Sequence, residues 1–590
     1  MGFFSTPLPP CDLHFWHWRR RSERLEPLCK HWAEHGPGMP IAFLVLYALK
    51  IVGFVAGGLV FVRLSFDTAA LASIGDWWTQ PSVFQKVIVW ALLFEILGLG
   101  SGFGPTSLPF LPPLGGPLYW LRPGTIRLPP WPGRVPFTRG STRTLVDVLL
   151  YLAVLLAAGW LLCSSATETG ALDPARVGPL AVLLPLLGLR DKTAFLAARP
   201  EHYGLTLLTF LLPPTDMMIA AQLLLVVMWW AAATSKLSRA FPFTVSTLLS
   251  NAPVVPRALS RRLFRSFPED MRPSRWAGLV AWIARMIEFG APLSLVSGNH
   301  TALLAGVVVL VGYHLTAMAL MPFGAPLEWN LVIVFSVLHL FWGHPRLDLG
   351  SAEQPLLIAL LTIPLVVLFG WGNVRPDQVS YLAAMRYYAG NWPVSMWALR
   401  PSAIEKIDTF VAKPTTMPHQ QLRRLYGEQI AEVFSHKVYT FRAMHHHGRG
   451  AFGLLPRAVG PTHEDAIVID GELMAGTMLG WNFGDAHLAG EQLVAALQER
   501  CGFTTGEVRV VVLESHPMGS ARQDYRLVDA AEGVFERGFI SVDDMVNRQP
   551  WEIEDLPTWV LSRSSSIKMD ESSTCPVPPA ENLLTKLDHE

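Results

Sequence analysis

The chain has 590 residues, of which 51% are hydrophobic and 16% are charged. Soluble domains carry about 25% charged residues, so this composition, with long apolar runs in residues 41–372, indicates a polytopic protein of the cell membrane. Lysine plus arginine and aspartate plus glutamate balance at 47 each, which gives no argument for a nucleic-acid partner. The five cysteines lack the paired spacing of a zinc ribbon, a redox motif or a disulfide framework.

Residues 1–40 are polar and aromatic and precede the first apolar run. The mixture of Trp, His and Arg suits a membrane interface, so we interpret the segment as an amphipathic lead-in at the membrane surface. An ordinary polar tail explains the composition equally well. A secretory signal would place its apolar core directly after the first basic residues and would end in a small-residue cleavage site, and this segment does neither.

The transmembrane domain is predicted over residues 41–372, with eight or nine helices, because a helix needs about 20 apolar residues to cross a bilayer. One run is too long for a single span and is interrupted by Pro213, Pro214 and Asp216, which predicts a half-helix followed by a full one. The predicted spans are 41–62, 83–99 (with Glu95), 145–163, 178–189, 205–234 and four further segments within 276–369.

Two connections in this domain have unusual compositions. Segment 100–143 is dense in Pro and Gly and carries five arginines but no acid, so it forms either an ordered loop or a lid packed over a cavity. The connector 237–276 is basic and therefore favours the cytoplasmic side. A count of eight or nine spans leaves the side of the C-terminal region open.

The composition changes at about residue 373. The strand-like runs EDAIVI and EVRVVVLES are separated by the helical run EQLVAALQERCG, which predicts a soluble α/β or α+β domain over 373–565. The Pro- and Ser-rich tail 566–590 is predicted to be disordered.

Ionisable residues inside apolar runs are costly in a membrane, which makes each one a functional candidate. Lys236 closes the run AAQLLLVVMWWAAATSK; shielded from water it would be a usable base, whereas an end-of-helix lysine can also extend to the headgroups. Glu288 and His314 lie well inside their spans. They either form a site together or with Lys236, or they make a structural hydrogen bond between helices.

The remaining histidines do not predict a metal site. His339 and His344 are five residues apart near an interface, and adjacent side chains such as those of 445–447 point in different directions. Two further polar motifs lie in the predicted C-terminal domain. Residues 390–392 (GNW) predict a tight turn that docks the C-terminal domain on the membrane part, and the segment with Asp485 and His487 is either a small polar pocket or a helix-capping turn.

Residues 200–345 carry a pattern with a known counterpart. The run WWAAATSKLSRAFPF, followed by Glu288, the helix with His314 and then MPFGAPLEWNLVIVFSVL, resembles the vitamin K-dependent γ-carboxylases and the bacterial HTTM (horizontally transferred transmembrane) proteins. The resemblance implies that Lys236 is the base that deprotonates a reduced naphthoquinone. It also implies that Trp229 and Trp230 contact this cofactor, with Glu288 and His314 shaping the pocket.

The departures from the carboxylase pattern narrow that expectation. The usual Gly of the motif is Ala or Thr here, one lysine stands where many carboxylases have two, and the C-terminal domain does not resemble their β-rich lumenal region. The resemblance therefore implies binding of a quinone or isoprenoid lipid more directly than it implies carboxylation of glutamate.

The whole chain also resembles a family of uncharacterised bacterial integral-membrane proteins with a domain of unknown function. The segments that carry this likeness are MRYYAGNWPVSMWALRP, FRAMHHHGRGAFGLLPRA and GWNFGDAHLAGEQLVAALQERCGF, and they bring no activity with them. Two functions follow from the sequence. One is an enzyme that acts on or with a membrane quinone or isoprenoid lipid, and the other is a non-catalytic lipid-binding, transport or scaffold protein.

Overall fold

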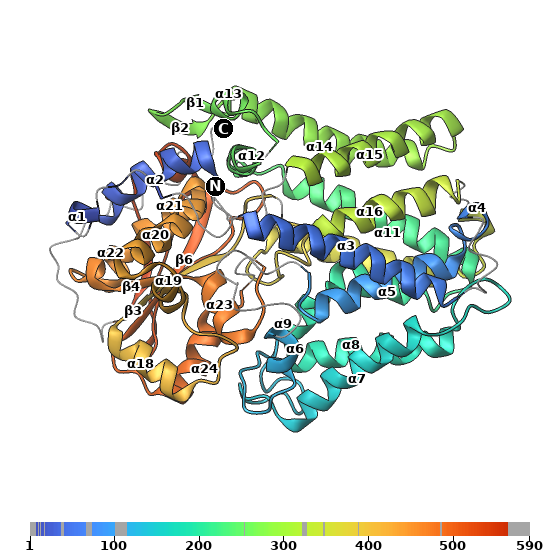
Figure 1. The fold of residues 1–590 in the computed structure, drawn as a ribbon, viewed down its shortest axis with the longest axis horizontal. Coiled ribbons are helices and arrows are strands. Elements are labelled where there is room, and N and C mark those ends of the chain that lie inside the picture. The colour runs from blue at the N-terminus through green and yellow to red at the C-terminus, as the bar shows by residue number, and fades with distance from the viewer. Residues whose placement is uncertain are drawn as a thin grey trace.

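The computed structural model shows a bundle of long helices beside a sheet with its own helices (Figure 1). It describes residues 8–9, 11, 13–16, 18–36, 41–65, 74–100, 115–252, 254–320, 327–345, 349–387, 389–483 and 487–564. The tail that was predicted to be disordered lies outside the described residues.

Within the described residues, six helices are long and apolar enough to cross a membrane. They are α3 (Ile41–Arg63), α7 (Leu145–Leu162), α11 (Pro214–Ser235), α14 (Arg275–Leu295), α15 (His300–Leu320) and α17 (Pro355–Val374). Shorter helices occupy the other predicted spans: α5 (Pro81–Ile96), α8 (Pro174–Arg190) and α16 (Leu327–Val337), which continues into the π-helical turn η4 (Leu338–Trp342). Six of the described helices are therefore long enough to span a membrane, whereas the sequence predicted eight or nine spans.

The predicted break before α11 is confirmed. The π-helical turn η3 (Pro200–Gly204) and α10 (Leu205–Thr209) end before Pro213, and α11 begins at Pro214. Proline lacks the amide hydrogen that a continuing helix needs and fits the first helical position, so the two prolines set this boundary.

Short elements connect the long helices. They are α1 (Leu13–Trp16), α2 (Arg21–His35), α4 (Ile74–Trp77), α6 (Gly115–Trp120), α9 (Lys192–Ala197), α12 (Phe241–Asn251), α13 (Arg257–Arg262), the hairpin β1 (Phe264–Ser266) and β2 (Asp270–Pro273), and η5 (Leu349–Ser351). Helix α2 packs against α20 (Glu428–Met444) of the C-terminal region and buries Leu25 and Cys29. The placement of residues 1–40 at a membrane surface stays a prediction.

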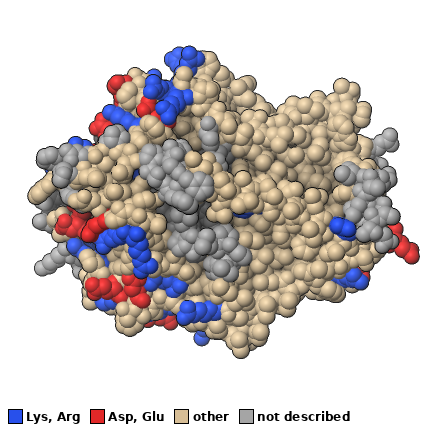
Figure 2. Space-filling model, in the orientation of Figure 1, with Lys and Arg blue, Asp and Glu red and all other residues tan. Residues whose placement is uncertain are grey.

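The surface separates into a charged part and an apolar part. Charged side chains gather over the C-terminal region and the connector around α13, whereas the view over the long helices is nearly free of charge (Figure 2). Large apolar side chains are exposed on α3, among them Leu49 (62%) and Val52 (64%). Exposed apolar surface of this extent fits lipid rather than water, and the chain is a multi-pass membrane protein.

The C-terminal sheet has six antiparallel strands in the order β4-β3-β5-β6-β7-β8. Their bounds are β3 (Val394–Leu399), β4 (Ile467–Asp470), β5 (Val508–Leu513), β6 (Arg522–Asp529), β7 (Gly533–Ser541) and β8 (Trp559–Arg563). The helices around the sheet are α18 (Pro401–Phe410), α19 (Pro418–Tyr426), α20, α21 (His446–Gly453), α22 (Leu455–Val459), the turn η6 (His463–Asp465), α23 (Gly471–Leu479), α24 (Glu491–Cys501) and α25 (Val542–Val546). The antiparallel pairing corresponds to the α+β alternative.

The two faces of the sheet belong to different cores. Trp397 of β3 lies in the same hydrophobic core as the buried residues of α5 and α11, whereas Met396 packs on the opposite face with α21 and α22. Successive side chains of a strand point to opposite faces, so this alternation lets one sheet face continue the core of the helix bundle.

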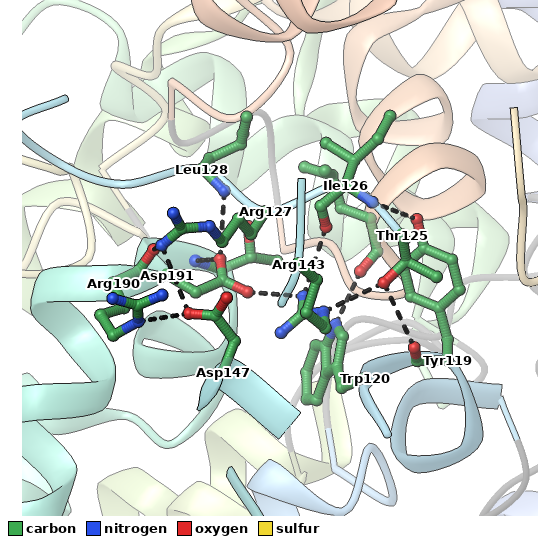
Figure 3. A network of polar contacts seen from close by, with 12 residues as sticks. Tyr119, Trp120, Thr125, Ile126, Arg127, Leu128, Arg143, Asp147, Arg190 and Asp191 are labelled. Carbon is green, nitrogen blue, oxygen red and sulfur yellow. Dashed lines mark hydrogen bonds and ion pairs between the residues drawn. The ribbon is translucent and has the colours of Figure 1, made fainter. Parts of the chain in front are cut away.

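The Pro-rich segment is an ordered strap between the two parts; residues 101–114 lie outside the described residues, and we call 115–143 the strap. The hydroxyl of Tyr119 and the indole N–H of Trp120 donate to the carbonyls of Met478 and Leu479 at the end of α23, at 2.5 and 2.8 Å. On the bundle side, the strap arginines pair with acids from neighbouring helices (Figure 3): Arg127 with Asp147 at 3.3 Å and Arg143 with Asp191 at 2.6 Å.

The GNW turn also joins the two parts. Gly390 has a φ of +71°, and a Cβ there would lie 1.7 Å from the hydroxyl of Thr244 on α12. Asn391 exchanges two hydrogen bonds with the backbone of His516, at 2.7 and 3.0 Å. Only glycine combines this backbone conformation with so close a contact, so the geometry fits the docking role predicted for the turn.

Candidate functional site

Lys236 and Glu288 meet in the interior of the bundle. Lys236 follows the last residue of α11, and its ammonium donates to both carboxylate oxygens of Glu288 on α14, at 2.5 and 2.6 Å. The two side chains are 4% and 6% exposed. The lysine therefore points inward to a carboxylate and is shielded from the surface of the protein.

A tyrosine completes the coordination of this carboxylate. The hydroxyl of Tyr313 on α15 donates to Glu288 at 3.0 Å, so three helices converge on one carboxyl group. The ring of Phe241 lies 5.5 Å from the Lys236 ammonium and covers the pair from α12. Two donors and an opposite charge compensate a carboxylate that would otherwise be costly at this depth. We call Lys236, Glu288 and Tyr313 the polar triad.

His314 makes a separate contact next to the triad. Its Nε2 accepts from the indole N–H of Trp229 at 3.1 Å, and its Nδ1 lies 2.9 Å from the amide oxygen of Asn330 on α16. Trp230 donates to the carbonyl of Phe289 at 3.1 Å. The five residues singled out in the sequence thus lie on or directly after α11, α14 and α15, but His314 bonds Trp229 and Asn330 and not Lys236 or Glu288. Their roles stay predictions.

Sequence reasoning missed Tyr313 and Asn330. A tyrosine in an apolar span is unremarkable by composition, although its position next to His314 was a usable signal. Asn330 is a buried amide in a short apolar helix, and intramembrane amides commonly bond between helices.

An apolar cleft lies between α14 and α15, the helices that carry Glu288 and Tyr313. Its volume is about 350 Å³, within the range of about 300–1,000 Å³ typical of small-molecule sites. The lining residues are Trp282, Ile283, Met286, Ile287, Ala291, Ser294, Ala305, Gly306 and Val309. Trp282, Ile283, Met286 and Val309 are 41–52% exposed, so the cleft opens on the outer face of the bundle.

Comparison with known proteins gives a family but no activity. Residues 1–561 match the family described as transmembrane protein of unknown function, DUF3556. The chain belongs to this family. No curated protein and no solved structure matches the chain. The predicted membership of an uncharacterised integral-membrane family is confirmed, whereas the likeness to HTTM proteins and carboxylases stays a prediction.

The bundle of this DUF3556 protein holds a second buried ionic group, of which sequence reasoning identified only Glu95. Arg199, with a φ of +55°, pairs with Glu201 at 2.5 Å, and its guanidinium lies 3.0 Å from the centroid of the Trp329 ring. Lys50 pairs with Glu328 at 3.0 Å. These charged residues could have been noticed because they cluster in or next to short or broken apolar runs, where the limits of a span are hard to predict.

Four histidines of the C-terminal region, His445–His447 and His516, form a buried aromatic group. The rings of His445 and His447 are stacked at 5.3 Å, and His446 lies 5.5 Å from His516. Burial lowers the pKa of His445 and of His516 to about 4, so both are neutral at physiological pH. Within the described residues, no group of three His, Cys, Asp or Glu side chains could hold a metal ion.

The other motif residues have structural partners. His344 Nδ1 lies 2.9 Å from the carbonyl of His339, whose own Nδ1 lies 2.9 Å from the carbonyl of Trp78. His487 contacts the Glu514 carboxylate at 2.8 Å. Burial alone would raise the pKa of Glu514, but the contacts with His487 and Arg526 outweigh it and lower the pKa. Asp485 lies outside the described residues.

Proposed function

We propose that this protein binds a membrane lipid of the quinone or isoprenoid type, with the polar head at the triad and the apolar tail in the cleft between α14 and α15. The observation that carries the proposal is the position of the cleft. Ile287 and Ala291 line it, and Glu288 lies between them on the same helix, turned toward Lys236.

The chemistry of the two parts suits such a lipid. The ammonium of Lys236 and the hydroxyl of Tyr313 are donors that a quinone carbonyl or a lipid hydroxyl can accept from, and the cleft offers almost only hydrocarbon to a tail. The resemblance of residues 200–345 to HTTM proteins and γ-carboxylases supports a quinone as the head group. In this proposal three further segments also cross the membrane: α5, α8, and α16 together with η4.

An enzyme that uses Lys236 as a base is the second candidate, favoured by the carboxylase-like motif at the end of α11. Nζ of Lys236 donates to both oxygens of Glu288, so it can act as a base on a substrate only after this contact opens. The closed pair favours lipid binding as the resting function.

The test fills the cleft by replacing Val309, which lines it, with tryptophan. The neighbouring Val308 is 66% exposed and does not line the cleft, so Val308→Trp is a matched control. Mass spectrometry of the hydrophobic molecules that co-purify in detergent should find a quinone or isoprenoid lipid with wild type and Val308→Trp. We expect Val309→Trp to lose at least about 90% of it, since an indole in the cleft displaces the tail. Equal lipid in both variants, or ordinary phospholipid throughout, contradicts the proposal.

A further inference from the structure

Five charged side chains lie where α3, α5, the turn at η3 and α16 meet. Four of them are buried and Lys50 is half-buried: Lys50, Glu95, Arg199, Glu201 and Glu328. Two of the three carboxylates have a cation of their own, because Lys50 pairs with Glu328 and Arg199 with Glu201. The third, Glu95, forms no ion pair with any described residue. The group therefore holds three acids and two bases.

Among the described residues, no third cation accompanies Glu95. The residue is 1% exposed, its Oε1 accepts from the indole N–H of Trp329, and its Oε2 has no hydrogen-bond partner among the residues that the structure describes. Among the described residues, the two cations whose charge acts on Glu95 are Arg199 and Lys50, and each already has a carboxylate partner of its own.

The other titratable groups around α5 are engaged or neutral. Lys86 of α5 donates to the carbonyl of Phe61, and Tyr151 of α7 donates to the carbonyl of Ile96. Tyr203 of η3 is fully buried, interacts electrostatically with Glu95, and has a hydroxyl without a partner among the described residues. Arg199 also acts on Glu95, but its charge is shared with Glu201.

An ionised Glu95 would therefore leave one negative charge uncompensated within the described part of the bundle. A buried charge without a partner is avoided when the group can take up or release a proton, and a carboxyl group can do so whereas a guanidinium cannot. We propose that Glu95 is a proton-binding site of the bundle and is a neutral carboxylic acid at neutral pH. The proton resides on Oε2, the oxygen that does not accept from Trp329.

Glu95 lies close to the residues that join the bundle to the C-terminal region, so its protonation affects that contact. The Arg199 guanidinium, which lies on the Trp329 ring, also faces Tyr387 at 5.0 Å and Phe483 at 6.0 Å, both from the C-terminal region. Loss of the Glu95 proton would place a second carboxylate in competition with Glu201 for Arg199. Proton exchange at Glu95 thus acts on the contact between the bundle and the C-terminal region.

Infrared spectroscopy of the full-length protein in detergent tests this proposal. Wild type at neutral pH should show a carboxylic-acid C=O band that shifts in heavy water and vanishes on titration to alkaline pH. The band should be absent from Glu95→Gln and present in Glu288→Gln, whose carboxylate is ion-paired in wild type.

A second variant keeps the test decisive if Glu95→Gln does not fold. Trp329→Phe removes the donor to Oε1 and retains an aromatic ring for Arg199, so the band should persist and move to higher frequency. A wild-type spectrum without the band, a band that survives in Glu95→Gln, or a band that does not move in Trp329→Phe overturns the proposal.

Discussion

Replacing Lys236 with methionine is expected to lower the free energy of unfolding by about 3–5 kcal/mol, because it leaves the Glu288 carboxylate buried without its cation. Glu288 would keep only the Tyr313 hydroxyl as a donor. Denaturant titration of the detergent-solubilised protein, followed by tryptophan fluorescence, measures the change.

The double variant Lys236→Met/Glu288→Gln is the control for this prediction. It removes both charges, and a buried ion pair replaced by neutral side chains of similar volume is often neutral for stability. We expect the double variant to unfold within about 1 kcal/mol of wild type, since the pair is coupled. A single variant as stable as wild type would mean that Glu288 does not depend on Lys236.

The second large effect is expected at the strap. Arg143 and Asp191 are both fully buried, and the arginine also donates to the hydroxyl of Thr125 at 3.0 Å and the carbonyl of Ile126 at 3.3 Å (Figure 3). Arg143→Met leaves the Asp191 carboxylate buried without its cation, which should lower the free energy of unfolding by about 3–5 kcal/mol. Thermal unfolding and limited proteolysis of residues 115–143 are the measurements, since a released strap should be cut faster.

Arg134→Met is the matched control, because Arg134 is an exposed arginine of the same strap. Exposed substitutions usually change stability by no more than about 0.5 kcal/mol. If the two variants proved equally stable and equally resistant to protease, the strap would not depend on its buried ion pair.

Local rules predicted the parts of this fold that depend on adjacent residues. Pro213 and Pro214 mark the start of α11 because proline acts on its own helix, and the long apolar runs mark the six spanning helices. The strap was harder to predict. Its arginines pair with Asp147 and Asp191, which lie outside the segment. The composition of the segment could therefore show that it lacks acids, but not which acids its arginines contact.

The sequence could predict single residues of the candidate site but not which of them contact each other. An ionisable group in an apolar run is conspicuous, which identified Lys236, Glu288 and His314. Which helices meet is a tertiary property, so the sequence could not tell that Lys236 bonds Glu288 while His314 bonds Trp229. Tyr313 escaped notice because its hydroxyl matters only through the carboxylate opposite it.

The central claim, that the triad and the cleft hold a lipid, is tested most directly by the lipid content of Lys236→Met/Glu288→Gln. This variant should fold while lacking the charged donor for a lipid head, so stability and binding are separated. The account predicts that the quinone or isoprenoid lipid found with wild type is lost from the folded double variant. An unchanged amount of that lipid per molecule of folded protein would contradict it.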